Sequence, residues 1–329
     1  MKVGTTRGHK SGPVGTNRSI ASYNVLEITV SESVPATQEM PDILYIMGTG
    51  RSGTTILEII LCNNPGLTGV GEFKYVFQHA FLENRVCSCG KAALECERWS
   101  GVLTATGWDR AACTEMERVV TSLESHARFP LLWAGLVSEK NMTIYRRANE
   151  SLFKSIAALS RSNVVVDSSK YESRALALAR LFPGRVKVLC LTRSAAGLIT
   201  AFQKKSEKEQ VYPKSLLWIA GYYVYVMLCM WIVRAQLKGR CLLVRFEDFK
   251  HNPEAVLDSI ETWSGYSLAV ARRKLAEGDW FTVGHIVSGN RIRTKGKVSF
   301  ESGSGEPALL GAARGLAKVL EAYRRCLGF

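Results

Sequence analysis

The sequence predicts an α/β fold in which a parallel β-sheet carries helices on both faces. Four short, continuously apolar segments have the length and composition of strands buried on both sides of such a sheet. Segments with helical spacing separate them, as the right-handed crossovers between parallel strands require. Of the 329 residues, 47% are hydrophobic and 22% charged, which is typical of a globular protein with a large core.

The elements follow one another in a regular order. The first strand is predicted at 43–47 and ends at Gly48, and the first helix at 54–63. Further strands are predicted at 163–167, 186–191 and 241–246. Further helices are predicted at 171–181, 195–205, 215–233, 253–263, 268–277 and 308–326. No repeat or domain boundary is visible after Pro41, so we expect a single domain over 41–329.

The first forty residues differ from the rest of the chain. Residues 1–40 are rich in Gly, Ser, Thr and basic residues and lack periodicity, which predicts a flexible basic leader. No apolar run of a signal peptide develops there. The nine cysteines are scattered from Cys62 to Cys326 and do not form the dense framework of a small secreted domain. A cytoplasmic location is the simplest expectation.

The net charge indicates an anionic partner. Lys and Arg number 43 against 29 Asp and Glu, a net charge of +14. Such a surplus favours binding of nucleic acid, a lipid surface or a phosphorylated small molecule, and charge alone does not distinguish these.

One segment has two interpretations. Residues 215–233 contain no charge and are long enough for a membrane-spanning helix. Three tyrosines within it carry hydroxyls that hydrocarbon leaves without partners. We therefore favour a helix buried in a large α/β protein over a membrane segment.

A glycine-rich loop follows the first strand. Residues 48–55 read Gly-Thr-Gly-Arg-Ser-Gly-Thr-Thr, the frame of a phosphate-binding loop (P-loop) that opens a helix. Glycines let successive backbone N–H groups point inward, and the helix N-terminus adds partial positive charge. The loop is therefore predicted to bind an anion.

The loop departs from the nucleotide-triphosphatase pattern at one position. Thr54 stands where that pattern has the lysine that neutralises the β- and γ-phosphates together with Mg²⁺. A sulfuryl group carries less negative charge than a phosphoryl group, so neither that lysine nor a metal is required to transfer it. Arg51 can instead make forked hydrogen bonds to a 5′-phosphate and its bridging oxygen.

Several segments in matching order resemble the sulfotransferases that use 3′-phosphoadenosine 5′-phosphosulfate (PAPS). GTGRSGTTIL at 48–57 is similar to their 5′-phosphosulfate loop, and LTRSAAGLIT at 191–200 to their 3′-phosphate segment. VRFED at 244–248 resembles their VRYED element, and CSCG…C…W at 87–99 recurs in some bacterial-type members. Glu72 is similar in position to the catalytic glutamate of tyrosylprotein sulfotransferases.

The resemblance implies a P-loop-type sheet and in-line transfer of a sulfuryl group from PAPS to an acceptor hydroxyl or amine without a metal. Glu72 would be the general base. The alternatives are that Glu72 only caps the following helix, or that His79 is the base. Residues that would cradle the 5′-phosphosulfate, with Arg51 also stabilising the leaving oxygen, are Arg51, Ser52, Gly53, Thr54 and Thr55.

Arg193 would bind the 3′-phosphate, with an uncertain partner. Family members usually continue with Asp-Pro-Arg and place Ser eight residues after the Arg, whereas this chain has Ser-Ala-Ala and Ala201 there. Either Thr200 or Ser194 can supply the second contact, and we prefer Thr200.

The cation-rich segment 285–297 resembles a C-terminal loop that closes over the donor. Arg291 and Arg293 are therefore candidates for the 3′-phosphate. Nucleic acid is not favoured, because no aromatic residues for base stacking are interleaved with these cations.

A lysine and a group of three cysteines each have two possible interpretations. Lys170 follows a strand and either reaches the sulfonate or acceptor, or is a solvated loop cation. Cys87, Cys89 and Cys96 have metal-ligand character but lack an evident fourth ligand, although Cys113 or His79 would serve. We expect no metal and interpret 85–99 as a lid or an acceptor-side insertion.

The rival functions are a P-loop small-molecule kinase, with Asp167 as its one candidate Mg²⁺ ligand, and a non-enzymatic basic protein binding membrane or nucleic acid. The acceptor itself is undetermined among carbohydrates, lipids, peptides and small metabolites, because acceptor pockets are built from variable loops.

Overall fold

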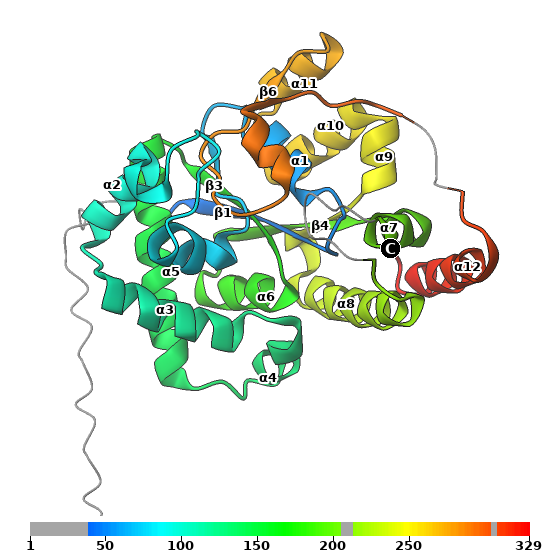
Figure 1. The fold of residues 1–329 in the computed structure, drawn as a ribbon, viewed down its shortest axis with the longest axis horizontal. Coiled ribbons are helices and arrows are strands. Elements are labelled where there is room, and N and C mark those ends of the chain that lie inside the picture. Colours follow the sequence, from blue (N-terminus) through cyan, green and yellow to red (C-terminus); the bar gives the residue numbers. More distant parts are fainter. Residues whose placement is uncertain (1–38, 205–212, 304–307) are drawn as a thin grey trace, which may run out of the picture.

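The computed structural model describes residues 39–204, 213–303 and 308–329. Its centre is a parallel sheet in the order β2-β3-β1-β4-β5 with helices on both faces (Figure 1). The strands are β1 (Asp42–Gly48), β2 (Leu67–Gly69), β3 (Val164–Lys170), β4 (Val186–Thr192) and β5 (Cys241–Arg245). The predicted α/β fold is confirmed. The predicted leader lies outside the described residues except for its last two.

Alternate side chains of the strands enter two separate cores. Ile43, Tyr45 and Met47 of β1 pack into one core, and Leu44 and Ile46 into the other. This two-sided burial explains why the strands are continuously apolar.

Different helices cover the two faces of the sheet (Figure 1). One face is covered by α1 (Thr54–Leu61), α9 (Phe246–His251), α10 (Pro253–Ser264) and α11 (Ala269–Ala276). The core on the other face contains residues of α2 (Glu97–Thr106), α3 (Arg110–Leu123), α4 (Phe129–Trp133), α5 (Glu139–Ser160), α6 (Glu172–Leu181), α7 (Ala195–Gln203), α8 (Leu216–Leu237) and α12 (Gly311–Cys326).

The predicted strands and helices are all present, with ends shifted by a few residues. The helix predicted at 195–205 ends at Gln203, and residue 205 lies outside the described residues. The helix predicted at 308–326 begins at Gly311. The short strand β2, the helix α9 and the helices between 97 and 160 were not predicted.

The long apolar helix α8 is buried on one face only. It contributes Tyr223, Met227 and Met230 to the core, whereas Trp218 and Trp231 are exposed. Within the described residues it is the one helix long and apolar enough to cross a membrane. Only 39% of its apolar 18-residue stretch is buried inside the protein. The prediction of a buried helix is therefore correct for one face of α8 only. Hydropathy is a property of the whole segment and does not indicate which of its faces packs against the rest of the protein.

A buried carboxyl group joins α1 to the sheet. Glu58 is fully buried and accepts hydrogen bonds from the N–H of Gly71 (2.5 Å) and the hydroxyl of Ser168 (2.6 Å). A Cβ at Gly69 would lie 2.9 Å from Glu58 Oε1, so this approach needs glycine. Burial raises the pKa of Glu58 to about 7. Glu58 thus fixes the start of the loop after β2.

Glu58→Gln is expected to remove a pH dependence of stability. Between pH 4.5 and about 7 the unfolded chain releases a proton that folded Glu58 retains, so the wild type loses stability as the pH rises. Glutamine keeps an acceptor for Gly71 and does not titrate. Across this window the wild type should lose on the order of 3 kcal/mol relative to the variant.

Urea unfolding at about pH 5 and about pH 8 measures this difference. The exposed Glu95→Gln serves as the control and should differ from the wild type equally at both values. Parallel stability curves for wild type and Glu58→Gln would contradict the prediction.

Candidate active site

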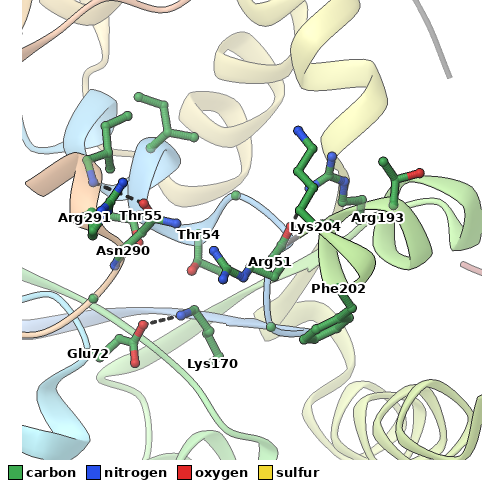
Figure 2. A pocket seen from close by; sticks show the side chains of 17 residues that line it. Arg51, Thr54, Thr55, Glu72, Lys170, Arg193, Phe202, Lys204, Asn290 and Arg291 are labelled. Atoms are coloured by element: carbon green, nitrogen blue, oxygen red, sulfur yellow. Dashed lines mark hydrogen bonds and ion pairs between the residues drawn. The ribbon is translucent and has the colours of Figure 1, made fainter. Parts of the chain in front are cut away.

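A cavity of about 770 Å³ opens where the strands of the sheet end. Its wall combines the loop after β1, the loop after β2, the end of β3, helix α7 and residues 289–292 (Figure 2). From the predicted site it contains Arg51, Gly53, Thr54, Thr55, Glu72, Arg193, Thr200 and Arg291, together with Lys170. The structure therefore brings together residues more than 200 positions apart in the sequence.

The glycine-rich loop packs tightly against β4 and α9. A Cβ at Gly48 would lie 2.5 Å from the carbonyl oxygen of Leu191, and one at Gly53 would lie 2.3 Å from the ring of Phe246. Gly53 also has a φ of 93°, in the left-handed region, immediately before α1. These constraints turn the N-terminus of α1, with its partial positive charge, towards the cavity.

Arg193 connects the end of β4 to this loop. One terminal nitrogen of its guanidinium donates to the carbonyl oxygen of Arg51 (2.7 Å), and its Cζ lies 5.1 Å from the centre of the Phe246 ring. Burial lowers the pKa of Arg193, and the nearby charge of Glu247 opposes this effect. Its Nε is buried without a partner. Because Arg193 also lines the cavity, its guanidinium can donate to an anion there.

The hydroxyls of Ser194 and Thr200 have different surroundings. Ser194 Oγ accepts from the N–H of Gly197 (3.2 Å) and so caps α7. Thr200 lines the cavity, and its buried hydroxyl has no partner. The hydroxyl of Thr54, at the opening of α1, is likewise buried without a partner. Since buried polar groups normally form hydrogen bonds, this cavity fits a ligand rich in oxygen atoms.

Glu72 and Lys170 lie side by side in the cavity wall and form an ion pair (Figure 2). Their side chains are 17% and 20% exposed, so both groups are largely shielded from water. The Glu72 N–H donates to the carbonyl oxygen of Ser288 (3.0 Å). Glu72 precedes the 3₁₀ turn Phe73–Tyr75, but its side chain makes no capping hydrogen bond. The carboxylate is therefore available to a ligand, beside an ammonium group.

The two arginines of the C-terminal segment have different positions. Arg291 lines the cavity, where the N–H of the neighbouring Asn290 approaches Thr55 Oγ1 (3.5 Å). Arg293 instead donates to the carbonyl oxygens of Val86 (3.0 Å) and Ile286 (3.3 Å). Arg293 is thus engaged with the backbone and is not part of the described cavity wall.

Three other candidates also lie outside the described cavity wall. Ser52 is buried, and its hydroxyl donates to the carbonyl oxygen of Thr49 (2.7 Å). His79 Nδ1 contacts the Ser288 hydroxyl (2.8 Å), and burial lowers the pKa of this imidazole. Asp167 is fully buried and paired with Arg174 (2.7 Å).

Further residues of the site were not predicted from the sequence. Phe202 and Lys204 line the cavity, and the hydroxyl of Tyr222 accepts from the N–H of Gly50 (2.8 Å). Lys204 stands four positions after Thr200, a spacing that places two residues on one helix face. That spacing was the one available signal, whereas the Tyr222 contact joins segments 172 residues apart.

Comparison with known proteins identifies one family. The model of the sulfotransferase family matches residues 41–269, and no curated protein matches the chain. The sulfotransferase domain from the curacin biosynthetic pathway is a similar solved structure, at 14% identity, with 86% of this chain and 98% of that chain covered and a TM-score of 0.46.

Two further solved structures are similar to the chain. For sulfotransferase STF9 from Mycobacterium avium the identity is 14%, with 75% of this chain and 70% of that chain covered and a TM-score of 0.45. For the sulfotransferase domain from the Synechococcus PCC 7002 olefin synthase the identity is 16%, with 87% of this chain and 96% of that chain covered and a TM-score of 0.39.

Proposed function

The chain belongs to the sulfotransferase family, and we propose that it transfers a sulfuryl group from PAPS to an acceptor hydroxyl or amine. The observation that carries this proposal is a set of buried polar atoms without partners around one cavity. Thr54 Oγ1, Arg193 Nε and Thr200 Oγ1 belong to residues of its wall, and together they match a donor with phosphate or sulfonate groups at two positions.

In this proposal the loop after β1 binds the 5′-phosphosulfate. Backbone N–H groups at the start of α1, the Thr54 hydroxyl and the Arg51 guanidinium surround it. Arg193 and Thr200 bind the 3′-phosphate, since both line the cavity and each has a buried polar atom without a partner in the protein. Arg291 adds positive charge from the opposite side of the cavity.

Glu72 is proposed to take the proton of the acceptor as its oxygen or nitrogen attacks sulfur. A bond from the acceptor to sulfur forms while the bond from sulfur to the 5′-phosphate oxygen breaks, and the 3′,5′-bisphosphate leaves. Arg51 stabilises the negative charge that develops on the leaving oxygen. Lys170, beside Glu72, is positioned to contact a sulfonate oxygen and to hold the carboxylate in place.

The kinase alternative is less well supported. It needs a carboxylate for Mg²⁺ near the loop, and its candidate, Asp167, is fully buried against Arg174. Thr54 also occupies the position of the lysine that would neutralise the terminal phosphates.

The acceptor stays a hydroxyl- or amine-bearing molecule in this proposal. Phe202 gives the cavity an apolar wall and contacts the exposed Trp218 edge to face, with 5.6 Å between ring centres. A cytoplasmic location remains part of the proposal. All nine cysteines are free thiols, and disulfides are rare in the cytoplasm.

Donor binding is expected to raise the melting temperature without Mg²⁺. Adenosine 3′,5′-bisphosphate should stabilise the protein, because it binds only the folded state, and 5′-AMP, which lacks the 3′-phosphate, should do so far less. Thermal-shift assays with each ligand in EDTA measure the effect. Stabilisation by ATP with Mg²⁺ but not by the bisphosphate would favour the kinase instead.

Thr200→Val is expected to weaken bisphosphate binding about tenfold, through loss of one hydrogen bond to the 3′-phosphate. Folding stability should be unchanged or slightly higher, because the removed hydroxyl has no partner in the protein. Isothermal titration calorimetry and urea unfolding measure the two quantities.

Ser194→Ala is the matched control for this prediction. It should cost about 1 kcal/mol of stability through the lost helix cap and leave the bisphosphate affinity unchanged. The opposite pattern in the two variants would assign the second 3′-phosphate contact to Ser194.

Glu72→Gln is expected to lower turnover by about 10²- to 10⁴-fold, because glutamine cannot accept the acceptor's proton. Bisphosphate affinity should stay close to that of the wild type. Mass spectrometry of acceptor pools for the gain of one SO₃ group measures turnover. The exposed Glu95→Gln is the control, and near-normal turnover of Glu72→Gln would transfer the base role to another group.

A further inference from the structure

Four potential metal ligands meet outside the described cavity wall. The ligand atoms of Cys87, Cys89, Cys96 and His285 all lie within 4.8 Å of one another. Cys96 Sγ is 3.7 Å from Cys87 Sγ and 3.2 Å from Nδ1 of His285. The residue that joins the three cysteines is therefore His285, 189 residues after Cys96, and not Cys113 or His79, which the sequence had suggested.

We propose that these four residues bind a structural zinc ion. Three thiolates and one imidazole form a ligand set of closed structural zinc sites. Zinc–sulfur bonds of about 2.3 Å in a tetrahedron place the sulfur atoms about 3.8 Å apart, close to the Cys87–Cys96 separation. The absence of carboxylate ligands among the four favours zinc over calcium or magnesium.

The backbone around the cysteines holds the ligands in place. The N–H of Cys87 donates to the carbonyl oxygen of Lys91 (2.9 Å), and the N–H of Gly90 donates to the carbonyl oxygen of Cys87 (2.9 Å). This tight turn presents Cys87 and Cys89 on one side. Cys96 immediately precedes α2, so the start of that helix fixes the backbone of the third cysteine.

Ser88, between the first two cysteines, fastens this turn to the segment of His285. Its hydroxyl donates to the carbonyl oxygen of Gly284 (2.7 Å) and accepts from the N–H of Ile286 (2.7 Å). Its own N–H donates to the carbonyl oxygen of Ile286 (2.9 Å). The hydrogen bonds on both sides of His285 bring the fourth ligand to the cysteines.

The proposed zinc ion would stabilise one wall of the donor cavity. Three residues beyond His285, the carbonyl oxygen of Ser288 accepts from the N–H of Glu72, and Arg291 lines the cavity. With four protein ligands the ion has no open position, so its role is structural and not catalytic. It would clamp the segment of 285–291 to the insertion that contains the cysteines.

The first test is the metal content of the full-length wild-type protein, purified under reducing conditions without a metal-affinity step. Inductively coupled plasma mass spectrometry should find about one zinc per chain. Replacement by Co²⁺ should give thiolate-to-cobalt charge-transfer bands and the visible spectrum of a tetrahedral site. Both readouts are independent of donor and acceptor, so they fail or succeed separately from the sulfotransferase proposal.

Variants identify the ligands. Cys89→Ser and His285→Ala should each retain less than about one tenth of the zinc under the same purification. The control variants Cys113→Ser and Cys326→Ser, which replace cysteines outside the cluster, should keep the full amount. Where a ligand variant does not fold, titration of the wild type with a mercurial reagent replaces it and should release one zinc per chain.

Two results would overturn the proposal. One is a wild-type protein with less than about one tenth of a zinc per chain after growth in zinc-supplemented medium. The other is a peptide map in which Cys87 and Cys96 are joined by a disulfide, which would make the cluster a redox pair.

Discussion

The hydrogen bond from Arg193 to the carbonyl oxygen of Arg51 unites the two halves of the proposed donor site. Arg51 has a φ of 67°, a left-handed conformation that costs a non-glycine residue about 1–2 kcal/mol. The contact with Arg193 stabilises the loop in this conformation. Because Arg193 also lines the cavity, the proposed 3′-phosphate site and the shape of the glycine-rich loop depend on one side chain.

The parallel sheet explains why distant residues converge. In the register of β1 with its neighbours, Met47 pairs with Lys170 and Gly48 pairs with Leu191. Lys170 and Arg193 therefore extend from the same edge of the sheet as the loop, one on each side of the central strand. A shift in the β1–β3 register after Tyr45 coincides with the left-handed backbone of Lys170, beside Glu72.

Local patterns were sufficient to predict the sheet, most helices and the glycine-rich loop. The apolar run of a strand buried on both faces and the periodicity of a helix can each be recognised within one short segment. They were insufficient for β2, which has three residues, shorter than any usable period. They also missed His285 as a companion of the cysteines, since only the tertiary fold joins those segments. The sequence also did not show that the hydroxyl of Ser194 caps α7, whereas that of Thr200 does not. Nor did it show that Arg293 donates to the carbonyl oxygen of Val86, because that contact forms only in the tertiary structure.

The position of Glu72 depends on groups that do not line the described cavity. The preceding Gly71 donates to buried Glu58, and Glu72 itself donates to Ser288. A Cβ on Gly71, whose φ is 72°, would lie 2.4 Å from both Ile286 Cγ2 and the Ser288 carbonyl oxygen, so the two segments meet without room for a side chain. Ionised Glu58 is the stronger acceptor for the Gly71 N–H, yet ionising it in the core costs stability. The contact that positions the loop of the proposed base therefore loses stability relative to the unfolded chain as the pH rises towards neutrality.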